Sequence, residues 1–99
     1  INKNPSRRVF QALRIVVNDE LGSLEKGLDN SFKVLKQNGR LSVITFHSLE
    51  DRIVKNYFID KSRSGEGRML FQKYIAPTDD EKRKNPRSAS AKLRTLIKN

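Results

Sequence analysis

The chain has 99 residues, with 21 lysines and arginines against 11 aspartates and glutamates, and a formal net charge of +10. This length allows one domain or part of one, and the absence of cysteine excludes disulfides and thiolate metal sites. The single histidine cannot build a zinc site without carboxylates. The apolar stretches are shorter than the roughly 20 residues of a membrane span, and no signal-peptide core is visible. We therefore expect a soluble, cytoplasmic protein without a membrane partner.

Positive charge is concentrated towards the C-terminus. Residues 1–50 carry eight basic and five acidic side chains, residues 51–99 carry thirteen and six, and residues 82–99 carry seven basic and no acidic ones. Such a field attracts phosphate, with an affinity that falls steeply as salt rises. A nucleic-acid surface is our first interpretation. A solubilising surface and an anionic lipid surface are alternatives, although no basic segment also has a broad apolar helical face.

The first 38 residues predict two helices with a joint near residues 18–23. Asn4-Pro5-Ser6 is typical of a helix start, and apolar residues recur at helical spacing after it. The first apolar stripe consists of Val9, Phe10, Leu13, Val16, Val17 and Leu21. The second consists of Leu21, Leu24, Leu28, Phe32 and Leu35. Gly39 after Asn38 predicts the end of the second helix, with the glycine in the left-handed conformation.

From Arg40 the pattern becomes that of a strand followed by a helix. Residues 41–46 are β-prone and nearly all apolar, which predicts an interior parallel strand covered on both faces. Ser48 and Asp51 form a capping-box pattern at the start of a helix that we expect to reach about Asp60. We assign its buried side to Leu49, Ile53, Val54, Tyr57 and Phe58. Helix, strand and helix in this order indicate an α/β layered fold.

The C-terminal 39 residues predict a loop, a strand, a helical turn and a last strand. Residues 61–68 have no apolar side chain, so we expect a mobile loop. A strand over 69–76 and a short helical turn capped by Thr78 follow, and Pro86 interrupts the turn. Residues 91–97 alternate apolar side chains with Lys92 and Arg94, which predicts a strand with one wetter face.

One group of chemically active side chains follows the strand at 41–46. In open α/β sheets ligands bind beyond the carboxyl ends of parallel strands, where helix N-termini offer unpaired amide groups. The group consists of His47, Ser48, Glu50, Asp51 and Arg52. Each member has a structural alternative: Ser48 can be a helix cap, His47 a structural side chain, and the three charged residues an exposed helix face. Serine hydrolysis is disfavoured because no glycine-flanked nucleophile turn surrounds Ser48.

A second group combines the turn Asn85-Pro86-Arg87-Ser88 with Lys92 and Arg94. Arginine offers a planar fork suited to phosphate, and a turn fixed by proline presents it with less flexibility. This combination indicates contact with an RNA or DNA backbone. Phe71 and Tyr74 lie between basic residues and can either stack on bases or belong to the core, and their strand spacing favours the core.

Four blocks of this sequence resemble the C-terminal part of the RsmH (MraW) family. They are Phe10-Gln11-Ala12-Leu13-Arg14-Ile15 with Val17 to Leu21, Gly39 to Phe46, His47 to Lys55, and Asn85-Pro86-Arg87 with Ser90 to Arg94. The family comprises bacterial S-adenosylmethionine-dependent methyltransferases that modify N4 of a cytidine in the decoding region of 16S ribosomal RNA. The chain departs from the family pattern at Asn4, where histidine is common, and at Ala89, where a second arginine is common.

The resemblance implies an α/β fold, namely the C-terminal part of a class I (Rossmann-like) methyltransferase sheet with flanking helices. Residues 1–38 would be a helical segment that links an inserted helical domain to the sheet. Residues 39–99 would be the C-terminal part of the methyltransferase domain: a strand, a helix, the loop 61–68 and a terminal strand pair. The N-terminal half with the glycine-rich cofactor loop has no counterpart in these residues. We therefore expect a fragment that is inactive alone and binds no S-adenosylmethionine, the cofactor of the full-length protein.

The resemblance also implies roles for the two groups of side chains. Those placed near the target base are His47, Ser48 and Asp51. Those that contact or position the RNA are Glu50, Arg52, Asn85, Arg87, Lys92 and Arg94. The expected partners are 16S rRNA and the small ribosomal subunit, together with a second copy of the chain through an unpaired edge of the strand 41–46. The alternatives are a non-catalytic basic RNA-binding fragment and a dedicated ribosome-associated protein.

Overall fold

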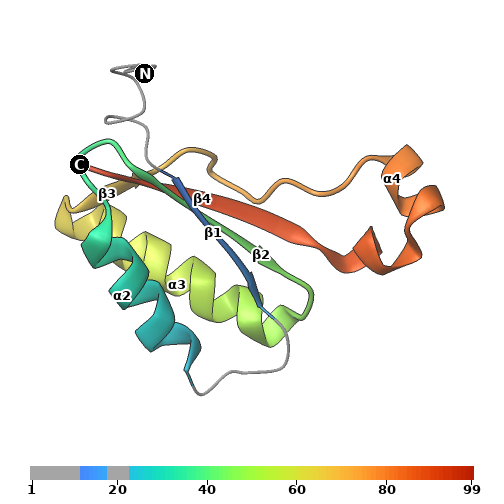
Figure 1. The fold of residues 1–99 in the computed structure, drawn as a ribbon, viewed down its shortest axis with the longest axis horizontal. Coiled ribbons are helices and arrows are strands. Elements are labelled where there is room, and N and C mark those ends of the chain that lie inside the picture. Colours follow the sequence, from blue (N-terminus) through green and yellow to red (C-terminus); the bar gives the residue numbers. More distant parts are fainter. Residues whose placement is uncertain (1–11, 18–22) are drawn as a thin grey trace, which may run out of the picture.

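The computed structural model describes residues 12–17 and 23–99, which form one four-stranded sheet with two helices packed against it and further helical turns at one end, away from the sheet (Figure 1). The strands, in their order across the sheet, are β1 (Ala12–Val17), β2 (Arg40–Thr45), β4 (Lys92–Lys98) and β3 (Gly67–Met69). The helices are α2 (Leu24–Val34), α3 (Ser48–Ser64), α4 (Asp79–Lys84) and the 3-10 helix η1 (Pro86–Ser90). β1 is parallel to β2, whereas β4 is antiparallel to both β2 and β3. The α/β fold class expected from the sequence is confirmed.

The core lies between α2, α3 and one face of the sheet. Leu41 and Val43 of β2 and Leu96 of β4 are fully buried. They join one cluster with the inward residues of the two helices: Leu24, Leu28, Phe32, Val54 and Phe58. Burying a side chain of this size contributes about 1.5–3 kcal/mol. The intervening β2 residues are only partly buried, so the expectation that this strand is covered on both faces is wrong.

Residues 12–17 form the strand β1, where the apolar spacing predicted a helix. The prediction was wrong because the same residues also carry the two-residue period of a strand, and β-branched Ile15, Val16 and Val17 favour it. Leu13 and Ile15 pack on the core, whereas Arg14 and Val16 are exposed. The rest of the predicted first helix and its joint, up to residue 22, lies outside the described residues.

β2 is an interior strand, flanked by β1 and β4 in the described sheet. The prediction that it would present an unpaired edge is therefore wrong, because the parallel pairing runs along all six residues from Arg40 to Thr45. The antiparallel register with β4 covers the same six residues. β1 and β3 are the outer strands of the described sheet.

The second predicted helix is confirmed as α2, but its end differs from the expectation. The helix stops at Val34, and the left-handed residue after it is Asn38, with φ 66°, rather than Gly39. Asparagine tolerates this conformation because its short polar side chain can hydrogen-bond locally. The Lys98 ammonium of β4 donates to the carbonyl oxygens of Phe32 and Lys33 at 3.2 and 3.3 Å, which satisfies the end of the helix.

α3 is longer than expected and takes up the first half of the predicted loop at 61–68. The helix continues to Ser64 and closes at Gly65, whose φ of 81° glycine adopts without strain. No apolar residue is needed in this last turn, because the ammonium of Lys61 lies over the Phe32 ring and pairs with Glu66 at 2.9 Å. At the other end of α3, Leu49 is exposed, contrary to the prediction.

The C-terminal elements follow the predicted order with one shortened strand. β3 ends at Met69, and the extended connector after it meets β4 again through the bridge between Ile75 and Leu93 (Figure 1). Thr78 caps α4 by accepting from the Glu81 amide at 3.2 Å, as expected. Pro86 begins η1, and β4 follows. The predicted wetter face of β4 is wrong, because Arg94 faces α3 and is buried.

Two glycines provide a matched test of the packing around β3. A methyl group at Gly67 would lie 3.1 Å from the Ile97 carbonyl oxygen and 3.2 Å from the Leu96 side chain. Gly67→Ala should therefore lower the free energy of unfolding by about 1–3 kcal/mol, measured by urea denaturation.

Gly27→Ala is the control, because no neighbouring atom of the described residues lies within 4 Å of the methyl group added at this position of α2. It should raise the free energy of unfolding by about 0.5–1 kcal/mol through helix propensity. A similar response to both substitutions would contradict the close approach of β3 to β4.

Candidate functional site

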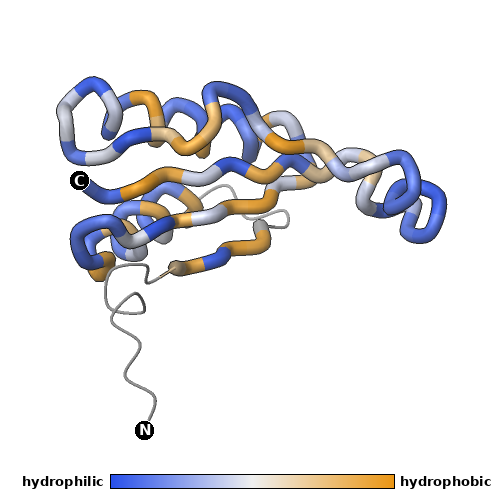
Figure 2. Tube along the Cα trace, turned by 90° about the horizontal axis from the view of Figure 1, so that it is seen from above, coloured by the Kyte–Doolittle hydropathy of each residue, from blue (hydrophilic) through white to orange (hydrophobic). Residues whose placement is uncertain are grey.

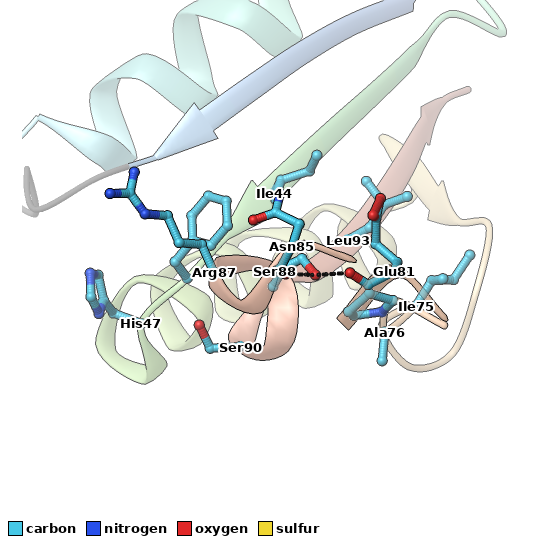
Figure 3. Close-up of a pocket in the computed structure, with 13 residues that line it drawn as sticks. Ile44, His47, Ile75, Ala76, Glu81, Asn85, Arg87, Ser88, Ser90 and Leu93 are labelled. Carbon is cyan, nitrogen blue, oxygen red and sulfur yellow. Dashed lines mark hydrogen bonds between the residues drawn. The ribbon is translucent and has the colours of Figure 1, made fainter. Parts of the chain in front are cut away.

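A pocket of about 730 Å³ lies at the carboxyl end of β2, on the face of the sheet opposite α2 and α3 (Figure 3). Its apolar floor includes Ile44 of β2 and Leu93 of β4, which are direct partners across the two strands. The whole lining consists of Ile44, Phe46, His47, Ile75, Ala76, Pro77, Glu81, Asn85, Arg87, Ser88, Ser90, Ala91 and Leu93. An apolar floor with a polar rim is typical of a small-molecule or base-binding site.

Three residues of the predicted site meet in this pocket. His47 stands where β2 passes into α3, and Asn85 and Arg87 come from the turn before β4. Figure 3 shows His47 and Arg87 on the same side of the pocket, across from Glu81. The hydroxyl of Ser88 donates to the Asn85 carbonyl oxygen at 2.7 Å and holds the turn in shape.

Asp51 and Arg94 form a buried ion pair on the other face of the sheet. Arg94 Nε and Nη2 donate to the two carboxylate oxygens of Asp51 at 2.7 and 2.9 Å. Thr45 adds a hydroxyl donor to Asp51 at 3.4 Å. The predicted capping box is therefore wrong: α3 begins after His47 without a side-chain cap among the described residues, and Asp51 turns towards β4. Two-point pairing of this kind fixes the orientation of both groups.

The cations around Asp51 keep its carboxylate ionised. Burial acts to raise the pKa of Asp51, but the hydrogen bonds and charge of Arg94, with the charge of Lys92 at 3.9 Å, hold this pKa below its usual value. A carboxylate with a lowered pKa is a weak base, which suits Asp51 to positioning Arg94 rather than to accepting a proton. The roles at the target base and on the RNA that the resemblance implies for Asp51 and Arg94 stay predictions.

Glu50 is 1% exposed, and neither of its carboxylate oxygens has a hydrogen-bond partner among the described residues. It lies on the inward side of α3, one turn before Val54 and two before Phe58. That spacing of four was visible in the sequence and could have placed Glu50 in the core. Ser48 and Arg52, the remaining predicted site residues, are exposed at the start of α3.

Other pocket residues were missed by the sequence reasoning. Phe46 was assigned only to the strand, and Glu81 only to the cap of the helical turn at Thr78. The pocket also receives Ile75 from the connector before α4, because the bridge to Leu93 draws that connector alongside β4. No local sequence pattern predicts this bridge, because Ile75 and Leu93 are far apart in the chain.

The ion pair predicts how stability depends on pH. The folded-state pKa of Asp51 is lowered, so its contribution is fully present above the unfolded pKa and is lost as pH falls through the folded value. Asp51→Asn should lower the free energy of unfolding at pH 7 by about 3 kcal/mol, because Arg94 stays buried without its counter-charge. The variant should also lose less stability than the parent chain between about pH 5 and pH 2.

Asp29→Asn is the control, because the pKa of Asp29 is also lowered, chiefly by a hydrogen bond from Lys33, but both side chains are exposed. Its effect on stability should be small. Equal losses in the two variants, measured by denaturant unfolding across this pH range, would argue against a special role of the buried pair.

The isolated carboxylate of Glu50 predicts a gain in stability on its removal. Glu50→Met keeps a similar side-chain volume and removes the buried carboxylate, which has no hydrogen-bond partner among the described residues. It should therefore raise the free energy of unfolding by about 1–3 kcal/mol. Glu50→Gln, which keeps a buried polar group, should gain less. A clear loss of stability in Glu50→Met, measured by thermal unfolding, would show that the carboxylate is satisfied.

Residues 1–99 match the MraW methylase family. The chain is 49% identical over 96 residues to ribosomal RNA small subunit methyltransferase H of Leptospira borgpetersenii serovar Hardjo-bovis (strain JB197), covering 97% of this chain and 30% of that protein. It is 50% identical over 95 residues to the protein of the same name from Coprothermobacter proteolyticus, and this match covers 96% of this chain and 32% of that protein. It is 47% identical over 114 residues to the protein of the same name from Paramagnetospirillum magneticum, and this match covers 96% of this chain and 35% of that protein. The chain thus spans about a third of the length of these relatives. Since the match runs along the whole chain, the protein belongs to the MraW methylase family.

Proposed function

We propose that this chain provides the RNA side of an rRNA methyltransferase that transfers a methyl group from S-adenosylmethionine to N4 of a cytidine in the decoding region of 16S rRNA. The observation that carries the proposal is the pocket at the end of β2, where His47, Asn85 and Arg87 meet. Membership of the family and the printed names of its relatives support the reaction class. They do not favour the two alternatives, a non-catalytic RNA-binding fragment and a dedicated ribosome-associated protein.

The shape and polarity of the pocket suit an RNA base that has left its stack. A base must be extruded before an enzyme can act on its exocyclic amine, and it then needs apolar contact with polar groups at its edge. The floor of Ile44 and Leu93 offers the first, and His47 and Asn85 offer the second. Arg87, exposed at the rim, suits the flanking phosphate.

The proposed reaction depends on position more than on a strong base. The cytosine amine is a weak nucleophile because its lone pair is conjugated with the ring. Holding it in line with the methyl group and removing its proton are therefore the two contributions this side of the site can make. We assign orientation of the base to His47 and Ser48, and positioning of the RNA to Arg52, Arg87 and Lys92.

The described residues do not fit S-adenosylmethionine. Adenosine cofactors of this class bind at a glycine-rich turn between a strand and a helix, whereas the described turn from β2 to α3 is Phe46-His47-Ser48. We propose that the donor is bound by parts of the methyltransferase without a counterpart in these 99 residues. On this proposal the chain alone is inactive and binds no cofactor.

We further propose the small ribosomal subunit as the partner and the cytoplasm as the location. In the part of the chain that the structure describes, no helix combines the length and apolar character needed to cross a membrane. Within the whole protein, residues 1–38 are proposed to lead from a helical insertion into the sheet, to which they contribute β1, and residues 39–99 to complete the methyltransferase domain. Self-association with a second copy of the chain stays a proposal, without the edge of β2 as its interface, because β2 is paired on both sides in the described sheet.

A chimera tests the proposal. This chain replaces the matching third of the Coprothermobacter proteolyticus relative, and methyl transfer from labelled S-adenosylmethionine to unmodified small ribosomal subunits is measured. His47→Ala should lower kcat by about 10²-fold through loss of the positioning of the base. Arg87→Ala should lower kcat/KM by about tenfold or more through loss of a charge-assisted phosphate contact.

Arg63→Ala is the matched control for Arg87→Ala, because this arginine is exposed in the last turn of α3, away from the pocket residues. It should leave methylation unchanged. Full activity in both pocket variants would remove His47 and Arg87 from the site, and methylation at a position other than cytidine N4 would refute the proposed specificity.

A further inference from the structure

The connector between β3 and α4 exposes a row of large apolar and aromatic side chains. About two fifths of each of Leu70, Phe71, Tyr74 and Ile75 is exposed. The strand spacing of Phe71 and Tyr74 had favoured the core, but the connector runs beside β4, on the side away from β2 (Figure 2). Among the described residues of the connector, Leu70 donates its amide to the Thr95 carbonyl oxygen, and Ile75 exchanges backbone hydrogen bonds with Leu93. An exposed apolar row of this kind marks a site of interaction.

Tyr74 is held by the cations of β4. Lys92 Nζ lies 4.8 Å and Arg94 Cζ 5.4 Å from the centroid of its ring. Arg94 is itself held in place by its two hydrogen bonds to Asp51, so the buried ion pair fixes one of the two cations that contact the Tyr74 ring. The ring is thus both preorganised and exposed, which reduces the entropy lost when a ligand stacks on it.

The position of Tyr74 relates it to the pocket. Consecutive residues of an extended segment point to opposite faces. Ile75 lines the pocket on the open face of the sheet, whereas Tyr74 lies against Lys92 and Arg94, which share the helix-covered face with Asp51. An RNA strand that runs from the pocket over the edge formed by the connector would therefore reach the Tyr74 ring on the other side.

Charge selects the occupant of this surface. Residues 82–99 carry seven basic and no acidic side chains, and Lys92 keeps about a third of its side chain exposed beside the ring. Aromatic rings bordered by cations bind single-stranded nucleic acids, because bases stack on the ring while phosphates meet the cations. An apolar protein partner would instead have to desolvate the Lys92 ammonium.

We propose that Tyr74, supported by Lys92 and Arg94, is a stacking platform for an unpaired base of the RNA next to the nucleotide in the pocket, and that Lys92 binds the adjoining phosphate. This inference rests on the proposed function, which supplies RNA as the ligand. It assigns a second contact on the same strand, outside the pocket.

The test uses the 99-residue chain and two labelled probes, a single-stranded RNA of about twelve nucleotides and a duplex of the same length. Dissociation constants are measured by fluorescence anisotropy at several salt concentrations. Tyr74→Ala should weaken binding of the single strand by about tenfold with little change for the duplex, whose bases are already stacked. Tyr74→Phe should restore the affinity, since it keeps the ring.

Lys92→Ala should weaken binding of both probes and reduce the salt slope by about one, as expected for a phosphate contact. Val34→Ala, an exposed apolar residue at the end of α2, is the control and should leave both affinities unchanged. Thermal unfolding of each variant is measured as a check that the fold is intact.

Unchanged single-strand affinity in Tyr74→Ala, an equal loss for both probes, or no RNA binding by the parent chain would overturn the stacking platform. The proposed function is judged separately by the chimera, where Arg87→Ala and His47→Ala affect methylation. Failure of one proposal is therefore distinguishable from failure of the other.

Discussion

The arrangement of the molecule depends on the buried pair of Asp51 and Arg94, which joins the first turn of α3 to the middle of β4. β4 also carries Leu93 of the pocket floor on its opposite face, and η1 leads directly into it. The pair therefore sets the position of η1 and Arg87 relative to His47. The pair stabilises the fold only while both groups are present, because the two buried charges compensate each other. If either residue is removed, the other remains as a buried charge without a counter-charge.

The sheet separates two kinds of chemistry. The open face provides an apolar floor edged by His47, Asn85 and Arg87, and on the helix-covered face Lys92 and Arg94 both pair with Asp51. Because neighbouring residues of a strand point to opposite faces, one segment serves both faces at once. This alternation explains how Leu93 can line the pocket while Arg94 supports Tyr74 on the other side.

Several features could be predicted because they depend on neighbours in the sequence. The spacing of Leu24, Leu28 and Phe32 determines α2, and Thr78 with Glu81 determines the start of α4. The pocket lined by His47, Asn85 and Arg87 lies at the carboxyl end of β2, which is where ligands bind in open α/β sheets. No local pattern joined Asn85 and Arg87 to His47. The membership in a methylase family follows from blocks of sequence that run along the whole chain.

Tertiary structure decided the features for which local patterns allow two answers. Residues 12–17 carry both a helical and a strand period, and pairing with β2 selects the strand. Arg94 looks like a solvent-facing residue of β4 until Asp51, far away in sequence, lies opposite it. The sequence by itself determined the family, most of the helices and the positive C-terminal end. Only the packed sheet decided which charged groups are buried and which aromatic rings are exposed, because burial depends on contacts between residues distant in the chain.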